Sequence, residues 1–274
     1  MDPVRQAWLA AHPYLAQVAE FQALVEEAAA GARTAPPATF EPCRPDLARG
    51  IPLLRSEAAG VDPRPAAAEA LGRIVERLAG AALPPALAQG AAGLRERFAR
   101  VPAERTAALQ RALAGGGEGE GEDPAGLERY LAWSALATAL AAVVEAFDRW
   151  RDDAAWGRPE CPTCGALPVM AQLVAADAGR ERRLACGRCR SRWRFRRIGC
   201  PYCANDRPER IDVFEVSGED GLRLDVCREC SGYVKTVARE DPPAFLLADW
   251  STVHLDALAR EQGYARRGAS LYDL

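Results

Sequence analysis

Eight of the nine cysteines form four Cys-x-x-Cys pairs between residues 161 and 230. The pairs are Cys161/Cys164, Cys186/Cys189, Cys200/Cys203 and Cys227/Cys230. Two thiolates on one tight turn, facing two thiolates on another, provide the four soft ligands of a tetrahedral zinc or iron site. The sequence therefore predicts two complete metal sites in each chain.

The lengths of chain between the pairs indicate which pairs share a metal. There are 21 residues between Cys164 and Cys186 and 23 between Cys203 and Cys227, but only 10 between Cys189 and Cys200. Each longer gap holds one hairpin, which would return the second pair to the first. We therefore expect a duplicated zinc-ribbon or rubredoxin-like module, with an interleaved, cross-braced pairing as the alternative. The expected ligands are Cys161, Cys164, Cys186 and Cys189 for site 1, and Cys200, Cys203, Cys227 and Cys230 for site 2.

The spacing does not identify the metal. Structural zinc would hold together a small domain with little core of its own, whereas iron in the same four-thiolate site would be redox-active. Gly165 directly follows the first pair and Gly232 lies one place beyond Ser231 after the last pair, so we expect both glycines to adopt the positive φ that turns N–H groups toward sulfur. The other two pairs are followed by Arg190 and Ala204, which favour this geometry less.

An arginine-rich stretch at residues 179–199 connects the two units and contains nine arginines and one glutamate. Alternate residues of a strand share a face. The two faces would carry Arg192, Arg194 and Arg196 on one side and Trp193, Phe195 and Arg197 on the other. Three interpretations remain open: an ordinary solvated face above buried aromatic residues, a protein-binding surface, or a site for single-stranded nucleic acid.

The other reactive residue types form no recognisable site in the sequence. His12 and His254 fall on predicted helical segments without a ligand-spaced partner, and we expect neither to bind metal. Cys43 lies alone between two prolines, which favours a packing or surface cysteine over a reactive thiol. There is no nucleophile elbow, phosphate-binding glycine loop or dinucleotide fingerprint. We therefore expect that the protein is not an enzyme.

The part of the chain before the cysteines is expected to be helical. Apolar residues recur with helical periodicity over residues 4–30, 65–78, 84–98, 102–113 and 124–150. The last of these stretches is the strongest and is rich in alanine, so we expect it to be the central helix of a bundle of five or six helices. Residues 115–124 are glycine-rich and acidic, which predicts a solvated loop.

After Cys161 the pattern changes to short apolar runs typical of strands: LPVMAQLV, RRLAC, RIDVFEV, LRLDVC and YVKTV. Turn residues at 177–179 and 218–221 predict two hairpins, and Asp241 followed by two prolines predicts the start of a C-terminal helix. We thus predict an α+β chain. Its parts are an α-helical domain at 1–155, a first rubredoxin-like metal module at 156–198, a second at 199–240, and a C-terminal helix and tail at 241–274.

Charge and hydropathy limit the compartment and the partners. The formal net charge is −3, with 16 basic and 21 acidic residues before Ala155 and 19 and 17 after it, and this balance does not point to nucleic acid. The N-terminus lacks a basic region followed by an apolar run of signal-peptide length, and the uncharged run at 130–144 is too short to span a membrane. We expect a cytoplasmic protein without membrane insertion, whose cysteine pairs bind metal or are redox-active rather than form structural disulfides.

Four stretches of the sequence together are more specific than any single cysteine pair. They are CPTCGALPV from Cys161, CGRCRSRWRFRRIGCPYC from Cys186 to Cys203, CRECSGYVKTV from Cys227, and AREQGYAR from Ala259 to Arg266. In these stretches the chain closely resembles the formate dehydrogenase accessory protein FdhE family. The resemblance extends over about the last 115 residues, and the helical part is similar in size and character.

The resemblance implies a helical N-terminal domain joined to two rubredoxin-like modules whose eight cysteines bind two metal ions, iron being expected before zinc. It also implies a cytoplasmic accessory or maturation protein that is required for formate dehydrogenase activity, binds the catalytic subunit of that molybdenum enzyme and associates as a homodimer. Arg192, Arg194 and Arg196 are the expected contact face for the partner. The alternative functions are a zinc-ribbon nucleic-acid-binding protein and an electron-transfer protein acting alone.

Overall fold

The computed structural model describes residues 3–114, 126–177, 179–219, 221–239 and 242–272. The acidic stretch predicted as a loop at 115–124 and the predicted helix cap at Asp241 therefore lie outside the described residues. The chain forms two compact units, a helical unit and a sheet unit. The helical unit comprises Gln17–Arg44 and Leu53–Trp150, and the sheet unit comprises Met1–Ala16, Pro45–Pro52 and Arg151–Leu274.

The helical unit is built around one long helix, as the alanine-rich pattern predicts. Its helices are α2 (Ala16–Ala29), α4 (Arg64–Ala79), α5 (Pro85–Arg100), α6 (Ala103–Ala114) and α7 (Gly126–Trp150), with 3-10 turns η2 (Glu41–Cys43), η3 (Leu53–Arg55) and η4 (Glu57–Ala59). The short helix α3 (Arg44–Ala48) starts at the end of the unit's first segment. α4 and α6 pack against α7. Small alanine side chains on α7 let these helices approach closely, and Leu131, Leu136 and Leu140 on α7 have no exposed surface.

Within the described part of the chain, α7 is the one helix long and apolar enough to cross a membrane. Its most apolar window has a mean hydropathy of 1.6, but 67% of that window is buried inside the protein. The central helix of a packed bundle passes the same test because it is apolar all round. We therefore assign α7 to the core of the helical unit, as the sequence predicts.

The N-terminal segment differs from the single helix predicted over residues 4–30. α1 spans Pro3–Ala11, a 3-10 turn η1 spans Pro13–Leu15, and α2 begins immediately after it. Pro13 causes the break, because its ring disfavours helical backbone at the preceding residue and removes an N–H donor. His12, with φ −126° and ψ 63°, lies outside the helical region. The break leaves His12 between two helices with its side chain buried.

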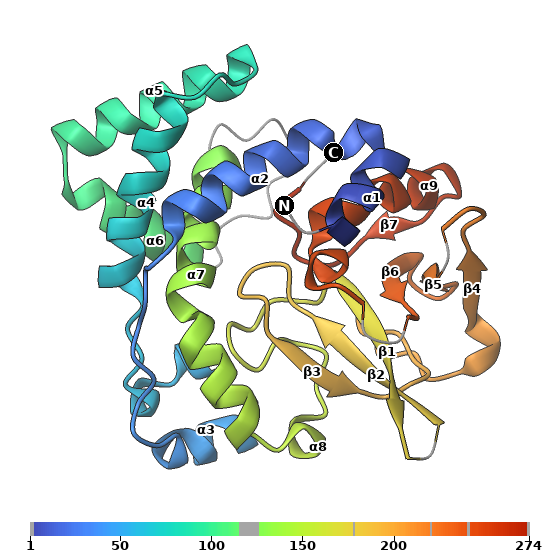
Figure 1. The fold of residues 1–274 in the computed structure, drawn as a ribbon. Helices are drawn as coiled ribbons and strands as arrows, with labels where there is room; N and C mark the ends of the chain where they lie inside the picture. Colours follow the sequence, from blue (N-terminus) through green and yellow to red (C-terminus); the bar gives the residue numbers. More distant parts are fainter. Residues whose placement is uncertain (1–2, 115–125, 178, 220, 240–241, 273–274) are drawn as a thin grey trace. The chain divides into compact units, whose positions relative to one another are not determined.

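The sheet unit contains one sheet that joins both cysteine modules (Figure 1). Its strands are β1 (Met170–Ala176), β2 (Gly179–Ala185), β3 (Arg192–Phe195), β4 (Ile211–Glu215), β5 (Leu222–Cys227), β6 (Gly232–Val237) and β7 (Ala265–Arg266). Their order is β3-β2-β1-β6-β5-β4, with β7 beside β6. The predicted hairpins β1/β2 and β4/β5 are antiparallel. The two modules are joined by parallel pairing of β1 with β6, with Met170 opposite Lys235, which the sequence pattern did not predict.

The C-terminal part is also more broken than predicted. In place of one helix after Asp241, the described residues form two 3-10 turns, η6 (Ala244–Leu247) and η7 (Asp249–Thr252), and then α9 (Val253–Glu261). α9 packs on β6 and β7. Its Leu255 and Ala259 are buried in the same apolar cluster as Val169, Met170 and several residues of β5 and β6. The helix thus covers the centre of the sheet, where the two modules meet. A short helix α8 (Asp153–Trp156) precedes the first cysteine pair.

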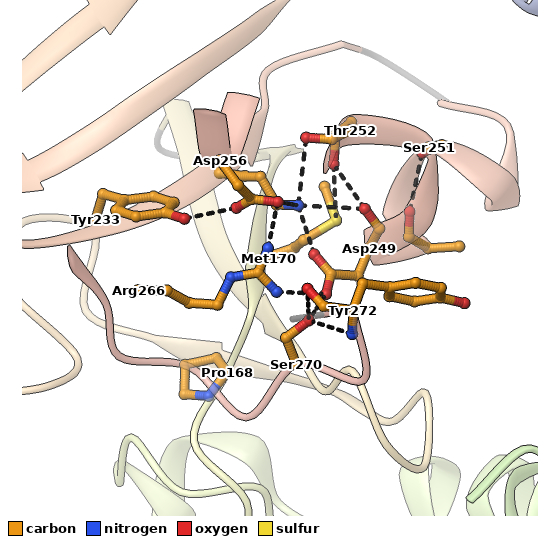
Figure 2. Close-up of polar contacts among 12 residues, drawn as sticks. Pro168, Met170, Tyr233, Asp249, Ser251, Thr252, Asp256, Arg266, Ser270 and Tyr272 are labelled. Atoms are coloured by element: carbon orange, nitrogen blue, oxygen red, sulfur yellow. Dashed lines mark hydrogen bonds and ion pairs between the residues drawn. The ribbon is translucent and has the colours of Figure 1, made fainter. Parts of the chain in front are cut away.

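A buried ionic network lies between the sheet and the C-terminal segment (Figure 2). Lys235, the one lysine in the sequence, has 1% of its surface exposed. Its Nζ lies 2.5 Å from Asp249 Oδ1 and 2.8 Å from Asp256 Oδ2. Arg266 pairs with both of these carboxylates, and the hydroxyl of Tyr233 donates to Asp256 Oδ1 at 2.7 Å.

The charges in this network compensate one another. Burial alone raises the pKa of Asp249, but the positive charges of Lys235 and Arg266 outweigh burial and lower the pKa of this carboxyl. Two cations face two carboxylates, the condition under which charges are tolerated in an interior. The network therefore fixes η7, α9 and β7 to β6.

Candidate metal centres

The first tetracysteine cluster combines the first two pairs. The Sγ atoms of Cys161 and Cys189 lie 3.5 Å apart, as do those of Cys164 and Cys186. A tetrahedral metal with four thiolates at about 2.3 Å holds neighbouring sulfur atoms about 3.8 Å apart, whereas a disulfide requires about 2.05 Å. The spacing thus fits four ligands of one metal and excludes disulfides. All four cysteines are buried.

The second cluster combines the third and fourth pairs. The Sγ atoms of Cys200 and Cys230 lie 3.6 Å apart, and those of Cys203 and Cys227 lie 3.7 Å apart. The sulfur atoms of each cluster lie within 4.8 Å of one another. Cys200 and Cys227 are buried, but Cys203 is exposed and Cys230 is partly exposed. The two clusters therefore differ in access: the first is closed and the second is open to solvent on one side.

The hairpins explain why these pairs meet. In the antiparallel register of β1 and β2, Met170 lies opposite Ala185, so Cys186 emerges beside the start of β1 and the pair that precedes it. In the second module, Ile211 lies opposite Cys227, which brings the fourth pair beside the start of β4 and the third pair. Each longer gap in the sequence thus folds as one hairpin. The grouping of the sulfur atoms is that of the sequential pairing rather than the interleaved one.

All four cysteine turns share one backbone geometry. The residue directly after the second cysteine of each pair has a positive φ: 81° at Gly165, 64° at Arg190, 60° at Ala204 and 55° at Ser231. The expectation that Gly232 plays this part was wrong, because Ser231 adopts the left-handed conformation one place earlier. A residue with a Cβ pays a steric cost for this conformation. Three such residues adopt it here, which indicates that the cysteine geometry determines the turn.

Backbone and side-chain N–H groups point at the sulfur atoms of both clusters. The amide of Arg188 donates to Cys186 Sγ and the amide of Tyr202 donates to Cys200 Sγ, both at 3.4 Å. The side-chain amide of Asn205 lies 3.6 Å from Cys227 Sγ. Such donors stabilise negative charge on a ligand sulfur. The turns are therefore arranged for thiolates rather than for neutral thiols.

The electrostatics of the first cluster call for a cation. Hydrogen bonds from Cys161 and the other two thiols lower the pKa of Cys186 well below its ordinary value. A hydrogen bond with Cys161 raises the pKa of Cys164, and burial raises the pKa of Cys189. Without a metal, the cluster thus stabilises the thiolate of Cys186 and keeps Cys164 and Cys189 protonated. A bound divalent metal ion would compensate the charge of all four.

The arginine face has the alternation predicted for a strand. In β3, Arg192 and Arg194 are exposed and Trp193 and Phe195 are buried. Arg194 Nε lies 3.2 Å from Glu181 Oε2. Arg196 is exposed, donates to a backbone carbonyl of the second module at 2.9 Å, and lies over the Phe195 ring. Arg197 was expected beside the aromatic residues, but it is exposed because β3 ends at Phe195. The three predicted arginines thus remain accessible to a partner.

The two histidines were not expected to form a site, and the structure brings them together. His12 and His254 lie with Glu219 in a group whose ligand atoms are within 4.8 Å of one another. Sequence reasoning missed this group because 207 residues separate His12 from Glu219. The chain offers no spacing signal for such a set.

Cys43 behaves as a packing residue. Its side chain has no exposed surface, and its thiol donates to the carbonyl of Phe40 at 3.0 Å. It lies in the helical unit, whereas both cysteine clusters lie in the sheet unit. The structure therefore places it with the core, as expected for a cysteine without a thiolate-stabilising environment.

Comparisons with known proteins find relatives named as FdhE homologues. The chain is 34% identical over 116 residues to "Protein FdhE homolog" of Stutzerimonas stutzeri, which is 40% of this chain and 37% of that protein. It is 32% identical over 114 residues to the protein of the same name from Aquifex aeolicus, covering 40% of each. The chain thus matches less than half the length of these curated relatives. No protein-family model matches it.

The fold comparison covers nearly the whole chain. The crystal structure of the FdhE protein from Pseudomonas aeruginosa superposes with a TM-score of 0.57 and 22% sequence identity, over 94% of this chain and 87% of that one. At this identity the match establishes the fold. The resemblance to the FdhE family is therefore confirmed, in sequence by relatives that match part of their length and in fold by the FdhE crystal structure.

Proposed function

We propose that this protein is a cytoplasmic accessory protein for formate dehydrogenase, not itself an enzyme, which binds the catalytic subunit of that enzyme during its maturation. The observation that carries the proposal is the pair of tetracysteine clusters on one sheet, in a chain with the FdhE fold. An accessory role fits the resemblance to FdhE, and the chemistry that this chain would bring to its client lies in the two cysteine clusters.

We further propose that Cys161, Cys164, Cys186 and Cys189 bind one metal ion and that Cys200, Cys203, Cys227 and Cys230 bind the other, with iron as the native metal. Four sulfur donors at tetrahedral spacing suit zinc and iron alike, and the family resemblance favours iron. Iron held by four thiolates supplies one-electron transfer. The residues around it hold the thiolates in place and donate N–H groups to sulfur.

The difference in burial supports different roles for the two sites. Site 1 is enclosed, and its two cysteine turns are joined by a hydrogen bond from Thr163 to Ser191 at 3.0 Å. Site 2 has Cys203 at the surface. A closed site suits stabilisation of the fold, whereas an exposed ligand suits exchange of electrons with a partner. We therefore assign the client-directed chemistry to site 2.

The partner would contact the arginine face formed by Arg192, Arg194 and Arg196. Arg192 and Arg194 lie on β3 and Arg196 directly follows it, between the second pair, ending at Cys189, and the third pair, beginning at Cys200. Guanidinium groups bind carboxylates with two parallel hydrogen bonds, so the expected partner surface is acidic. The resemblance also leads us to propose a homodimer, with a solution mass twice the 29.5 kDa of one chain.

Complementation tests this function. In a host that makes a respiratory formate dehydrogenase and lacks its own accessory protein, the wild-type chain should restore formate oxidation. Cys203→Ser should restore little activity, because it removes the exposed ligand of site 2. Cys43→Ser is the matched control and should restore activity fully, since serine can keep the hydrogen bond to Phe40. Equal restoration by both variants would contradict the role of site 2.

A further inference from the structure

A cluster of two imidazoles and one carboxylate lies in the sheet unit, apart from the cysteines. His12 lies at the break between α1 and η1, Glu219 in the turn between β4 and β5, and His254 on α9. One ligand atom from each lies within 4.8 Å of the others. Their side chains are mostly buried, with 8%, 11% and 15% of their surface exposed for His12, Glu219 and His254 respectively.

The hydrogen bonding of His12 fixes which nitrogen faces the carboxylate. Nδ1 lies 2.8 Å from the carbonyl oxygen of Trp8, so Nδ1 carries a proton and donates it there. Nε2 lies 2.7 Å from Glu219 Oε1. In the neutral ring, this places a lone pair directly against a carboxylate oxygen. The arrangement therefore requires a positive species between these two atoms, either a proton on His12 or a bound cation.

A proton on His12 would leave the other buried atoms unsatisfied. His254 Nε2 lies 3.1 Å from the same Glu219 oxygen. His254 Nδ1 and Glu219 Oε2 are buried without a hydrogen-bond partner among the described residues, and His254 Nε2 faces the one Glu219 oxygen that His12 already contacts. One cation would satisfy both imidazoles and the carboxylate together, which one proton cannot.

The surroundings hold the imidazoles in place. The Trp8 ring stacks on His12 with centroids 3.8 Å apart, and the Tyr14 ring lies edge-on to both histidines, 5.8 Å from His12 and 5.7 Å from His254. The Nδ1–H hydrogen bond to a backbone carbonyl is the arrangement that commonly orients a metal-binding histidine. The aromatic rings thus form an apolar wall around three polar atoms that converge.

We propose that His12, Glu219 and His254 form a third metal site, which binds a divalent transition-metal ion of the zinc type through two imidazole nitrogens and one carboxylate. Three protein ligands leave a coordination position for water or an outside ligand. Ligands on one zinc at about 2.0–2.1 Å lie about 3–3.5 Å from one another, so small side-chain shifts complete the site. Bound metal would tie the N-terminal segment to the β4/β5 turn and to α9.

Calorimetric titration of the full chain tests the proposal. Protein with both cysteine sites filled with Zn²⁺ is titrated with further Zn²⁺, and one additional equivalent should bind. Glu219→Gln and His254→Gln should weaken this additional binding by at least about tenfold, since loss of a ligand costs no less than loss of a residue that orients one. Glu215→Gln, an exposed position on β4, is the matched control and should bind like the wild type.

Cobalt distinguishes this site from the cysteine sites and shows that the variants fold. The additional Co²⁺ should give weak visible bands without sulfur-to-metal charge transfer, because the proposed site contains no thiolate. Every variant should retain the charge-transfer intensity of two tetrathiolate sites. The proposal is overturned if the wild type binds no metal beyond the cysteine sites, or if the additional equivalent persists unchanged in both glutamine variants.

Discussion

The Sγ atoms of Cys161 and Cys189 lie 3.5 Å apart although 28 residues separate them along the chain. The antiparallel hairpin of β1 and β2 produces this approach, since its turn reverses the chain between the first and second pairs. The same relationship recurs in the second module between Cys200 and Cys230, at 3.6 Å. Two metal sites thus follow from two hairpins. Metal binding at each site can be tested separately by substituting the cysteines of that site.

Loss of one ligand from the second cluster should remove one metal and leave the other. Cys200→Ser takes a buried sulfur from site 2, and none of the site 1 ligands lies in its cluster. In Co²⁺-substituted protein, the sulfur-to-metal charge-transfer intensity should fall by about half. Cys43→Ser should leave it unchanged. A loss of both tetrathiolate signatures in Cys200→Ser would favour an interleaved arrangement of ligands.

A chelator should remove the two thiolate-bound metals at different rates. Cys203 is exposed and Cys230 partly exposed, whereas the four cysteines of site 1 are buried. Metal release is monitored with a colorimetric zinc chelator under anaerobic conditions. We expect a fast phase of release from site 2 and a slow phase from site 1. The fast phase should disappear in Cys203→Ser. If Cys164→Ser removed the fast phase instead, the assignment of the open site would be wrong.

The buried lysine should be essential for the stability of the sheet unit. Removing Lys235 leaves two carboxylates facing one arginine in an interior, a change that typically costs about 3–5 kcal/mol. Urea unfolding of metal-loaded Lys235→Ala should show a loss of this size. Arg197→Ala, which removes an exposed cation, should change the free energy of unfolding by less than about 0.5 kcal/mol. Equal effects of the two variants would mean that the network contributes little.

The stability that the buried network of Lys235 and Asp249 supplies should decrease in acid. The pKa of Asp249 is lowered in the folded chain because burial, which raises it, is outweighed by Lys235 and Arg266. The stability from this carboxylate is complete above its unfolded pKa of about 3.9 and is lost as the pH falls through the lower folded value. The difference in unfolding free energy between wild type and Asp249→Asn should therefore shrink below pH ~4. A difference independent of pH would show that Asp249 is not ionised.

The sequence predicted the features that local chemistry and spacing determine. The helices of the helical unit, the two hairpins and the composition of the cysteine clusters all follow from periodicity, turn residues and gap lengths. The break at His12 was missed because the apolar pattern continues through Pro13, and a proline can also be accommodated in the first turn of a helix. The left-handed φ at Ser231 was missed because glycine adopts a positive φ without steric cost, which favours the neighbouring Gly232.

Relationships between distant segments were not predictable from one sequence. The parallel pairing of β1 with β6 joins residues 65 positions apart, Met170 and Lys235, and carries no turn signal. The approach of His12 to Glu219 depends on where the N-terminal segment docks in the sheet unit. Such contacts are set by tertiary packing, which periodicity does not encode.

Direct binding between the purified chain, with both cysteine sites metal-loaded, and the purified catalytic subunit of formate dehydrogenase tests the central claim. The account predicts saturable binding that weakens when the arginine face is removed by combined alanine substitutions of Arg192, Arg194 and Arg196. A control with equal loss of charge should bind like the wild type; its alanine substitutions are at the exposed Arg33, Arg95 and Arg100 of the helical unit, none of which lies near a cysteine pair in the sequence. Absence of binding by wild-type chain with both thiolate sites filled would contradict the account.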